Sequence, residues 1–206
     1  MKILTLNDRK NVIEQNSYLV IDNDICILID AGISLDELKK YTTKLDAVLL
    51  THAHYDHILF LNEINGFFNC PIYVSKIDEK ALYSSKLNLA IIFGKVFKFN
   101  TNLENLETFE DNEIIKFGNL AITCLLTPGH TAGSSCFLID NNLFSGDTLF
   151  ADTVGRTDLP TSSRLEQKSS LKRLDSLNFN NLYPGHGRTS TRTEQNENIK
   201  FWLSVN

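Results

Sequence analysis

Apolar runs rich in β-branched residues recur along the chain between short polar turns, and this pattern predicts β-strands. The first half contains the runs ILTL, SYLVID, ICILID, AVLLT and IYVS, and the second half contains EIIKF, LAITCLL, SCFLID and NLFSGD. Helical patterns cover residues 34–44, 57–65, 76–92, 162–177 and 191–205. Because each half runs through its strands and then finishes with helices, we expect two αβ halves packed sheet against sheet with the helices outside, an α+β fold.

Two details of this pattern can be checked in the structure. The helix predicted at 34–44 opens with Ser34 as an N-cap residue and with acidic residues in its first turn. The segment 95–112 fits either a strand or a loop. The length of 206 residues suits one sizeable domain and is too short for two full ones, so we expect a single domain over residues 1–206.

Composition and charge exclude several classes of function. The net charge of −5 and the isoelectric point near 5.5 argue against a nucleic acid or an anionic membrane as the main partner. No apolar run approaches the roughly 18–20 residues that span a bilayer, and the N-terminus turns polar too early for a signal peptide. We therefore expect a cytoplasmic protein. The cysteines form no CxxC pair and are expected to be buried, reduced and structural, namely Cys26, Cys70, Cys124 and Cys136.

The stretch THAHYDH places His52, His54, Asp56 and His57 directly after the apolar run AVLL. Neutral imidazole and carboxylate are ligands for Zn²⁺, Fe and Mn²⁺, and alternation along an extended segment turns the rings of His52 and His54 to the same side. The alternative is a polar turn that is rich in histidine by chance. A loop that follows a buried strand is a place where ligands can converge without competing with core packing.

Three further residues extend this candidate metal set. His130 and His186 each follow a glycine in a turn, and Asp147 follows Gly146 at the end of another apolar run. Seven ligands suit two ions better than one. A natural partition gives His52, His54 and His130 to the first ion and Asp56, His57 and His186 to the second, with Asp147 bridging. A structural zinc site is the alternative, but such sites are more often rich in cysteine.

An open binuclear site predicts a hydrolase. Two ions that share one water lower its pKa towards neutrality and give a hydroxide nucleophile, while one ion also polarises the substrate carbonyl. The predicted catalytic residues are His52, His54, Asp56 and Asp147. Zinc is the expected metal, with iron and manganese as alternatives, because sets of histidine and aspartate with open positions serve all three.

The HxHxDH motif and the later His130, Asp147 and His186 resemble those of the metallo-β-lactamase superfamily in order and context. The resemblance implies an αββα sandwich of two packed mixed sheets with outer helices, and metals at one edge. The stretches GDTLFADTVGRTDLP and PGHGRTST look like small single-domain glyoxalase II-like hydrolases. Asp147 stands where many true β-lactamases carry a cysteine, which argues against hydrolysis of antibiotics.

The resemblance to glyoxalase II implies a thioesterase. Its expected partner is a small-molecule thioester such as S-lactoylglutathione, cleaved by a metal-bound hydroxide. A thiolate leaves unaided near neutral pH, since the pKa of a thiol is about 8.5. One alternative is a mononuclear-iron persulfide dioxygenase of the same superfamily, which carries a similar GRTD segment. Another is a non-hydrolytic di-iron redox or metal-binding module.

Three local features leave alternatives open. Arg156 of the GRTD segment could meet substrate carboxylates or could close a turn by pairing with Asp158. Tyr55, between the ligands, could line the mouth of the pocket or pack against a loop. Relatives commonly have a glycine soon after the motif, whereas this chain has Leu59 and Phe60, which predicts a narrower opening. The oligomeric state is left open.

Overall fold

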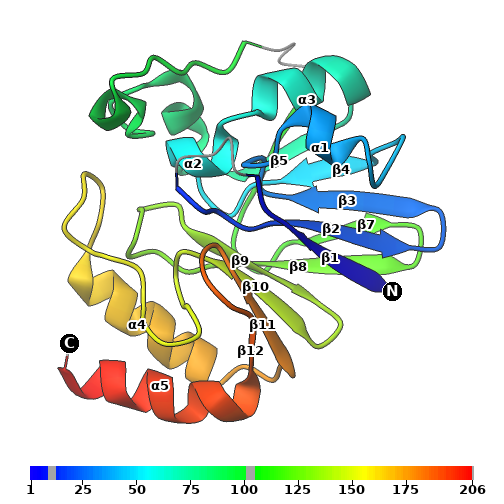
Figure 1. Ribbon diagram of the computed structural model, residues 1–206. Helices are drawn as coiled ribbons and strands as arrows, with labels where there is room; N and C mark the ends of the chain where they lie inside the picture. The colour runs from blue at the N-terminus through cyan, green and yellow to red at the C-terminus, as the bar shows by residue number, and fades with distance from the viewer. Residues whose placement is uncertain (9–12, 101–104, 206) are drawn as a thin grey trace. The chain divides into compact units, whose positions relative to one another are not determined.

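The computed structural model describes residues 1–8, 13–100 and 105–205. The chain divides into two compact units, unit 1 over Met1–Phe109 and unit 2 over Glu110–Asn206. Within these residues, each unit contains a mixed six-stranded sheet with helices (Figure 1). Among the described residues, no helix is long and apolar enough to cross a membrane.

The sheet of unit 1 keeps its strands in sequence order. It consists of β1 (Lys2–Leu6), β2 (Ser17–Asp22), β3 (Ile25–Ile29), β4 (Ala47–Leu49), β5 (Ile72–Ser75) and β6 (Leu106–Phe109). The pairs β1–β2 and β2–β3 are antiparallel, and the pairs from β3 to β6 are parallel. Parallel strands end at the same edge of a sheet, so the segments that follow β3 and β4 meet there. The part of segment 95–112 at 106–109 is a strand, and residues 101–104 of it lie outside the described residues.

The helices of unit 1 are shorter than the sequence predicts. Those that lie within the described residues include α1 (Leu35–Leu38), α2 (Tyr55–Ile58), α3 (Leu61–Phe68) and the 3₁₀-helices η1 (Glu79–Tyr83) and η2 (Ala90–Phe93). The prediction of a long helix at 34–44 is wrong beyond its first turn, and the hydroxyl of Ser34 makes no capping hydrogen bond. The helix predicted at 57–65 is divided, because Phe60 leaves the helical conformation at φ −107° and ψ 12°.

The prediction of a helix over 76–92 is also wrong. Leu89 adopts a left-handed conformation with φ 65°, which ends any helix that reaches it. The buried side chain of Asn88 stabilises this bend, because it donates hydrogen bonds to the carbonyl oxygens of Ala81 and Phe97 and accepts one from the N–H of Ala90. At this bend, hydrogen bonds from one side chain to three backbone groups take the place of the i→i−4 backbone hydrogen bonds of an α-helix.

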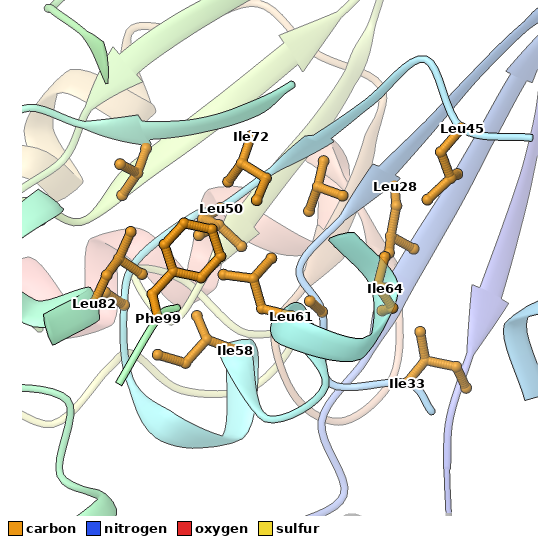
Figure 2. Packing of buried hydrophobic residues seen from close by; sticks show 14 of the residues in the cluster. Leu28, Ile33, Leu45, Leu50, Ile58, Leu61, Ile64, Ile72, Leu82 and Phe99 are labelled. Atoms are coloured by element: carbon orange, nitrogen blue, oxygen red, sulfur yellow. The ribbon is translucent and has the colours of Figure 1, made fainter. Parts of the chain in front are cut away.

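The core of unit 1 fixes the helices that carry the histidine motif. In Figure 2, Ile58 of α2 and Leu61 and Ile64 of α3 lie among apolar side chains of the sheet and its flanking segments. Those partners include Leu28, Leu50, Ile72, Leu82 and Phe99. Because α2 is only four residues long, this packing rather than its own helical hydrogen bonds determines where its side chains lie.

Unit 2 contains the strands and helices that the second half of the sequence predicts. Its sheet has the order β12-β11-β10-β9-β8-β7, with β7 (Ile114–Phe117), β8 (Leu120–Leu126), β9 (Ser135–Ile139), β10 (Asn142–Gly146), β11 (Asn181–Pro184) and β12 (Ser190–Thr191). Only β10 and β11 pair in parallel among these strands. The helices α4 (Arg164–Asp175) and α5 (Arg192–Val205) confirm the predictions at 162–177 and 191–205.

The cysteines follow the structural prediction. All four are buried and carry free thiols. Burial raises the pKa of Cys70 and of Cys136 to about 11, so both thiols stay protonated near neutral pH and are poor nucleophiles.

Candidate metal centre

The histidine motif of unit 1 begins in the extended segment just after β4. The N–H and the hydroxyl of Thr51 each donate a 2.8 Å hydrogen bond to the carboxylate of Asp30, and the N–H of Ala53 donates to Asp78 at 3.2 Å. Two buried carboxylates therefore hold the backbone on either side of His52. The rings of His52 and His54 lie 4.7 Å apart between centroids, which confirms that alternation turns them to the same side.

The remaining two candidate ligands of the motif lie in α2. The N–H of His57 donates to the carbonyl oxygen of His54, so the chain turns into the helix and brings His57 back beside His52, with ring centroids 4.1 Å apart. Asp56 Oδ2 lies 3.6 Å from His57 Nε2. The structure thus gathers in one place all four residues predicted from the THAHYDH stretch.

Asp30 is a residue of this site that the sequence interpretation missed. It follows β3, is buried, and its Oδ2 lies 2.8 Å from Nδ1 of His57. A carboxylate accepts the proton of Nδ1, and this leaves the lone pair of Nε2 for a metal. A signal was present in the sequence, because the run ICILID ends in an acidic residue and β3 pairs in parallel with β4.

Gly32 allows the chain after β3 to approach the motif closely. A Cβ atom at this position would lie 2.6 Å from the carbonyl oxygen of Asp56. The neighbouring backbone is joined to the motif as well, because the N–H of Ala31 donates to the carbonyl oxygen of His57 at 2.7 Å. Only glycine fits this contact between the two segments. Phe60, predicted to narrow the opening, packs against the core of unit 1.

In unit 2, the carboxylate of Asp147 lies between two imidazole rings. Its Oδ2 is 3.4 Å from Nε2 of His130 and 3.5 Å from Nε2 of His186. Asp147 follows β10 and His186 follows β11, and these strands are parallel neighbours, so their ends bring the two residues together. The structure therefore gathers all three ligands predicted in the second half of the chain.

The GRTD segment positions His130. The backbone carbonyl oxygen of Arg156 accepts a 3.0 Å hydrogen bond from Nδ1 of His130, which again leaves Nε2 for a metal. Gly155 is required there, because a Cβ atom would lie 1.8 Å from the carbonyl oxygen of Asp147. The guanidinium of Arg156 pairs with both carboxylate oxygens of Asp158, at 2.7 and 2.8 Å. This pair lowers the pKa of Asp158 and is the internal interaction that the sequence offered as one alternative.

The donor atoms in each unit fit the spacing of metal ligands. Two atoms that are each about 2.1 Å from a tetrahedral zinc ion lie about 3.4 Å apart. The three Nε2–Oδ2 distances within the units are 3.4, 3.5 and 3.6 Å, longer than good hydrogen bonds and close to this value. The residues present therefore fit a metal of the type that imidazole and carboxylate bind. The division of the seven residues between two ions draws on both units and stays a prediction.

Comparison with known proteins identifies the family. The model of the metallo-beta-lactamase superfamily matches residues 11–186. A probable metallo-hydrolase, MJ0888 of Methanocaldococcus jannaschii, is 36% identical over 189 residues, which cover 86% of this chain and 89% of that protein. A probable polyketide biosynthesis zinc-dependent hydrolase, PksB of Bacillus subtilis, is 34% identical over 180 residues, 82% of this chain and 72% of that protein.

Solved structures show the same fold. The crystal structure of BLEG-1, a B3 metallo-beta-lactamase, has a TM-score of 0.87 at 26% identity and covers 98% of this chain and 99% of its own. TTHA1623, solved in a di-iron-bound form, has a TM-score of 0.82 at 29% identity and covers 98% of this chain and 100% of its own. These matches confirm the predicted α+β fold class, the sandwich of the metallo-β-lactamase type. The chain belongs to the metallo-β-lactamase superfamily and is a metallo-hydrolase of that family.

Proposed function

We propose that this protein is a binuclear metal-dependent hydrolase that cleaves thioesters such as S-lactoylglutathione. The observation that carries the proposal is the position of Asp147 Oδ2, 3.4 and 3.5 Å from the Nε2 atoms of two histidines. A carboxylate oxygen placed in this way suits a ligand that bridges two ions. The similarity to a zinc-dependent hydrolase supports zinc, and the di-iron form of a structural relative keeps iron as an alternative.

The ligands divide in the proposal as the sequence predicts. His52, His54 and His130 would hold one ion, Asp56, His57 and His186 the other, and Asp147 both. When bound, the ions would supply an activated water and polarise the substrate carbonyl. Asp30 and the carbonyl oxygen of Arg156 hold the protons of Nδ1 on His57 and His130, so that these rings keep a fixed orientation.

The thioester is favoured over other acyl substrates because of its leaving group. A thiol has a pKa of about 8.5, so the thiolate leaves near neutral pH without a general acid. The side chain of Arg156, which could have met a substrate carboxylate, is engaged with Asp158. In this proposal the reaction therefore needs no catalytic side chain beyond the seven proposed ligands.

The first test is release of thiol from S-D-lactoylglutathione. Protein freed of metal is reconstituted separately with zinc, iron and manganese, and thiol is measured with a chromogenic reagent. Asp56→Ala should reduce the rate to that of buffer, and Asp24→Ala, which changes an exposed aspartate in the β2–β3 turn, should leave it unchanged. Turnover that is equal in wild type and Asp56→Ala would contradict the proposal.

Two further arms separate the rival activities. A chromogenic β-lactam tests antibiotic hydrolysis, because one structural relative is a metallo-beta-lactamase. Oxygen uptake by the iron-loaded protein with glutathione persulfide tests dioxygenase activity. Thiol release without either of these reactions supports the thioesterase, and oxygen uptake without thiol release would replace it by the dioxygenase.

The bridging role of Asp147 is tested by counting metal ions. Asp147→Ala should lose one or both ions per chain and should lose activity with them, because its carboxylate is the shared ligand in the proposal. The number of ions is measured by native mass spectrometry. Full metal occupancy together with wild-type turnover would show that Asp147 is not a ligand.

A further inference from the structure

An exposed apolar surface lies in unit 1 on the segment around η2. Ile91, Ile92, Phe93 and Val96 are exposed to 60%, 63%, 40% and 84%. We call this segment, residues 91–96, the apolar loop; Lys95 is its one charged residue. Isolated exposed apolar side chains are ordinary, but several on one short segment usually mark a binding surface.

The apolar loop is held in this conformation by the residues before and after it. Asn88 is fully buried and bonds both sides of the bend, and the N–H of Lys95 donates to the carbonyl oxygen of Ala90 at 3.0 Å. Phe97 is buried, and its N–H donates to the hydroxyl of Ser85 at 3.0 Å. These bonds hold the backbone in a conformation that leaves the apolar side chains of the loop exposed to solvent.

The apolar loop is joined directly to the metal motif. The N–H of Tyr55 donates to the carbonyl oxygen of Asn88 at 2.7 Å, and Tyr55 stands between the ligands His54 and Asp56. The ring of Tyr55 lies 5.9 Å from that of Phe93 and 6.0 Å from that of Phe97. Tyr55 thus packs against a loop, one of the two roles that the sequence allowed for it. Tyr55 therefore connects the exposed Phe93 of the apolar loop to the segment that carries the predicted ligands.

We propose that the apolar loop binds the acyl chain of the substrate, and that the thioesters this enzyme prefers carry an apolar acyl chain of several carbons. The inference rests on the proposed thioesterase function. The acyl half is the occupant because the common thiol carriers are rich in amides and charges, which gain nothing from isoleucine, valine and phenylalanine. A lactoyl group is too short and too polar to use this surface.

The test compares acyl chains on one thiol. The kcat/KM for thioesters of N-acetylcysteamine is measured from acetyl to octanoyl. Full burial of one methylene is worth about fourfold in an equilibrium constant, and an open surface covers about half of it, so we expect kcat/KM to rise about twofold per methylene. The double variant Ile92→Ser with Val96→Ser should flatten this dependence, because it removes apolar surface from the loop. Both side chains are exposed, so the change should not disturb the core.

A matched control uses the two exposed phenylalanines of unit 1. Phe93 and Phe67 are exposed to similar degrees, but only Phe93 contacts Tyr55 among the ring contacts of the described residues. Phe93→Ser should flatten the dependence on chain length, and Phe67→Ser should leave it as in wild type. A dependence that is flat in wild type, or that survives both loop variants, overturns the inference.

Binding of uncleaved analogues separates this inference from the proposed function. S-alkyl thioethers of N-acetylcysteamine are titrated calorimetrically into the metal-loaded protein. If no thioester is cleaved, the proposed function fails. Affinity that rises with chain length in wild type, and not in the double variant, still supports binding of an acyl chain by the apolar loop. Analytical ultracentrifugation completes the test: a wild-type oligomer that the double variant dissociates, with unchanged chain-length dependence, would show that a second copy of the chain occupies the loop.

Discussion

Two groups that are not metal ligands determine which nitrogen of a histidine is available to a metal. Asp30 accepts from Nδ1 of His57, and the carbonyl oxygen of Arg156 accepts from Nδ1 of His130. In both rings the lone pair of Nε2 is then available to bind a metal. The candidate ligands themselves could be proposed from the sequence because their residue types and spacing are distinctive. Every residue has a backbone carbonyl group, so the sequence could not indicate that the one of Arg156 would accept a hydrogen bond from His130.

Replacement of Asp30 tests its role in holding His57. Asp30→Asn keeps the size of the side chain but removes the charge that favours a donated proton at Nδ1, so metal affinity should fall about 10- to 100-fold. Affinity is measured by competition with a chromophoric chelator. Asp46→Asn is the control, since Asp46 also accepts a backbone N–H, that of Cys26 at 2.7 Å. Equal affinities in the two variants would show that Asp30 serves only the fold.

Two glycines give opposite predictions for the same substitution. Gly155→Ala places a Cβ 1.8 Å from the carbonyl oxygen of Asp147, and overpacking of this kind should lower the free energy of unfolding by about 1–3 kcal/mol. Gly66, within α3, meets nothing within 4 Å, so Gly66→Ala should raise it by about 0.5–1 kcal/mol. Urea denaturation measures both, and a loss of stability in Gly66→Ala would show that the helix needs glycine there.

At the scale of elements, two serines with similar sequence contexts differ in what they do. The hydroxyl of Ser163 accepts a 3.3 Å hydrogen bond from the N–H of Glu166 and caps α4, whereas the hydroxyl of Ser34 makes no such bond to α1. Ser163→Ala should therefore cost about 1 kcal/mol and Ser34→Ala almost nothing. For a chain of this size the first change corresponds to a fall in Tm of about 2–4 °C. Equal changes in Tm would refute the difference in capping.

The strands could be predicted more reliably than the helices of unit 1. An apolar run such as SYLVID can be recognised as a buried strand from its own residues alone, and the bounds of β2 coincide with this run. The segment 76–92 has a helical pattern, but Asn88 and the left-handed Leu89 redirect the chain through contacts with Ala81 and Phe97. Such contacts depend on residues brought together by folding, so periodicity within the segment could not reveal them.

For the whole molecule, metal binding should stabilise the folded state. A ligand that binds only the native chain adds about 2.7 kcal/mol at a hundredfold excess over its Kd, so zinc should raise Tm by about 5–10 °C. Differential scanning calorimetry with and without a chelator measures this shift. Asp24→Ala should show the full shift and Asp56→Ala a smaller one. The same shift in both variants would mean that zinc stabilises the protein through other residues.

The sheet of unit 1 has its six strands in the order of the sequence, and the four candidate ligands of that unit lie between residues 52 and 57. Every strand of that sheet has therefore been synthesised by Phe109, before the first residue of unit 2. During synthesis the N-terminal part of a chain is made first. The connectivity therefore sets the order of synthesis: a growing chain already carries the complete histidine motif while Asp147 and His186 are still to be added.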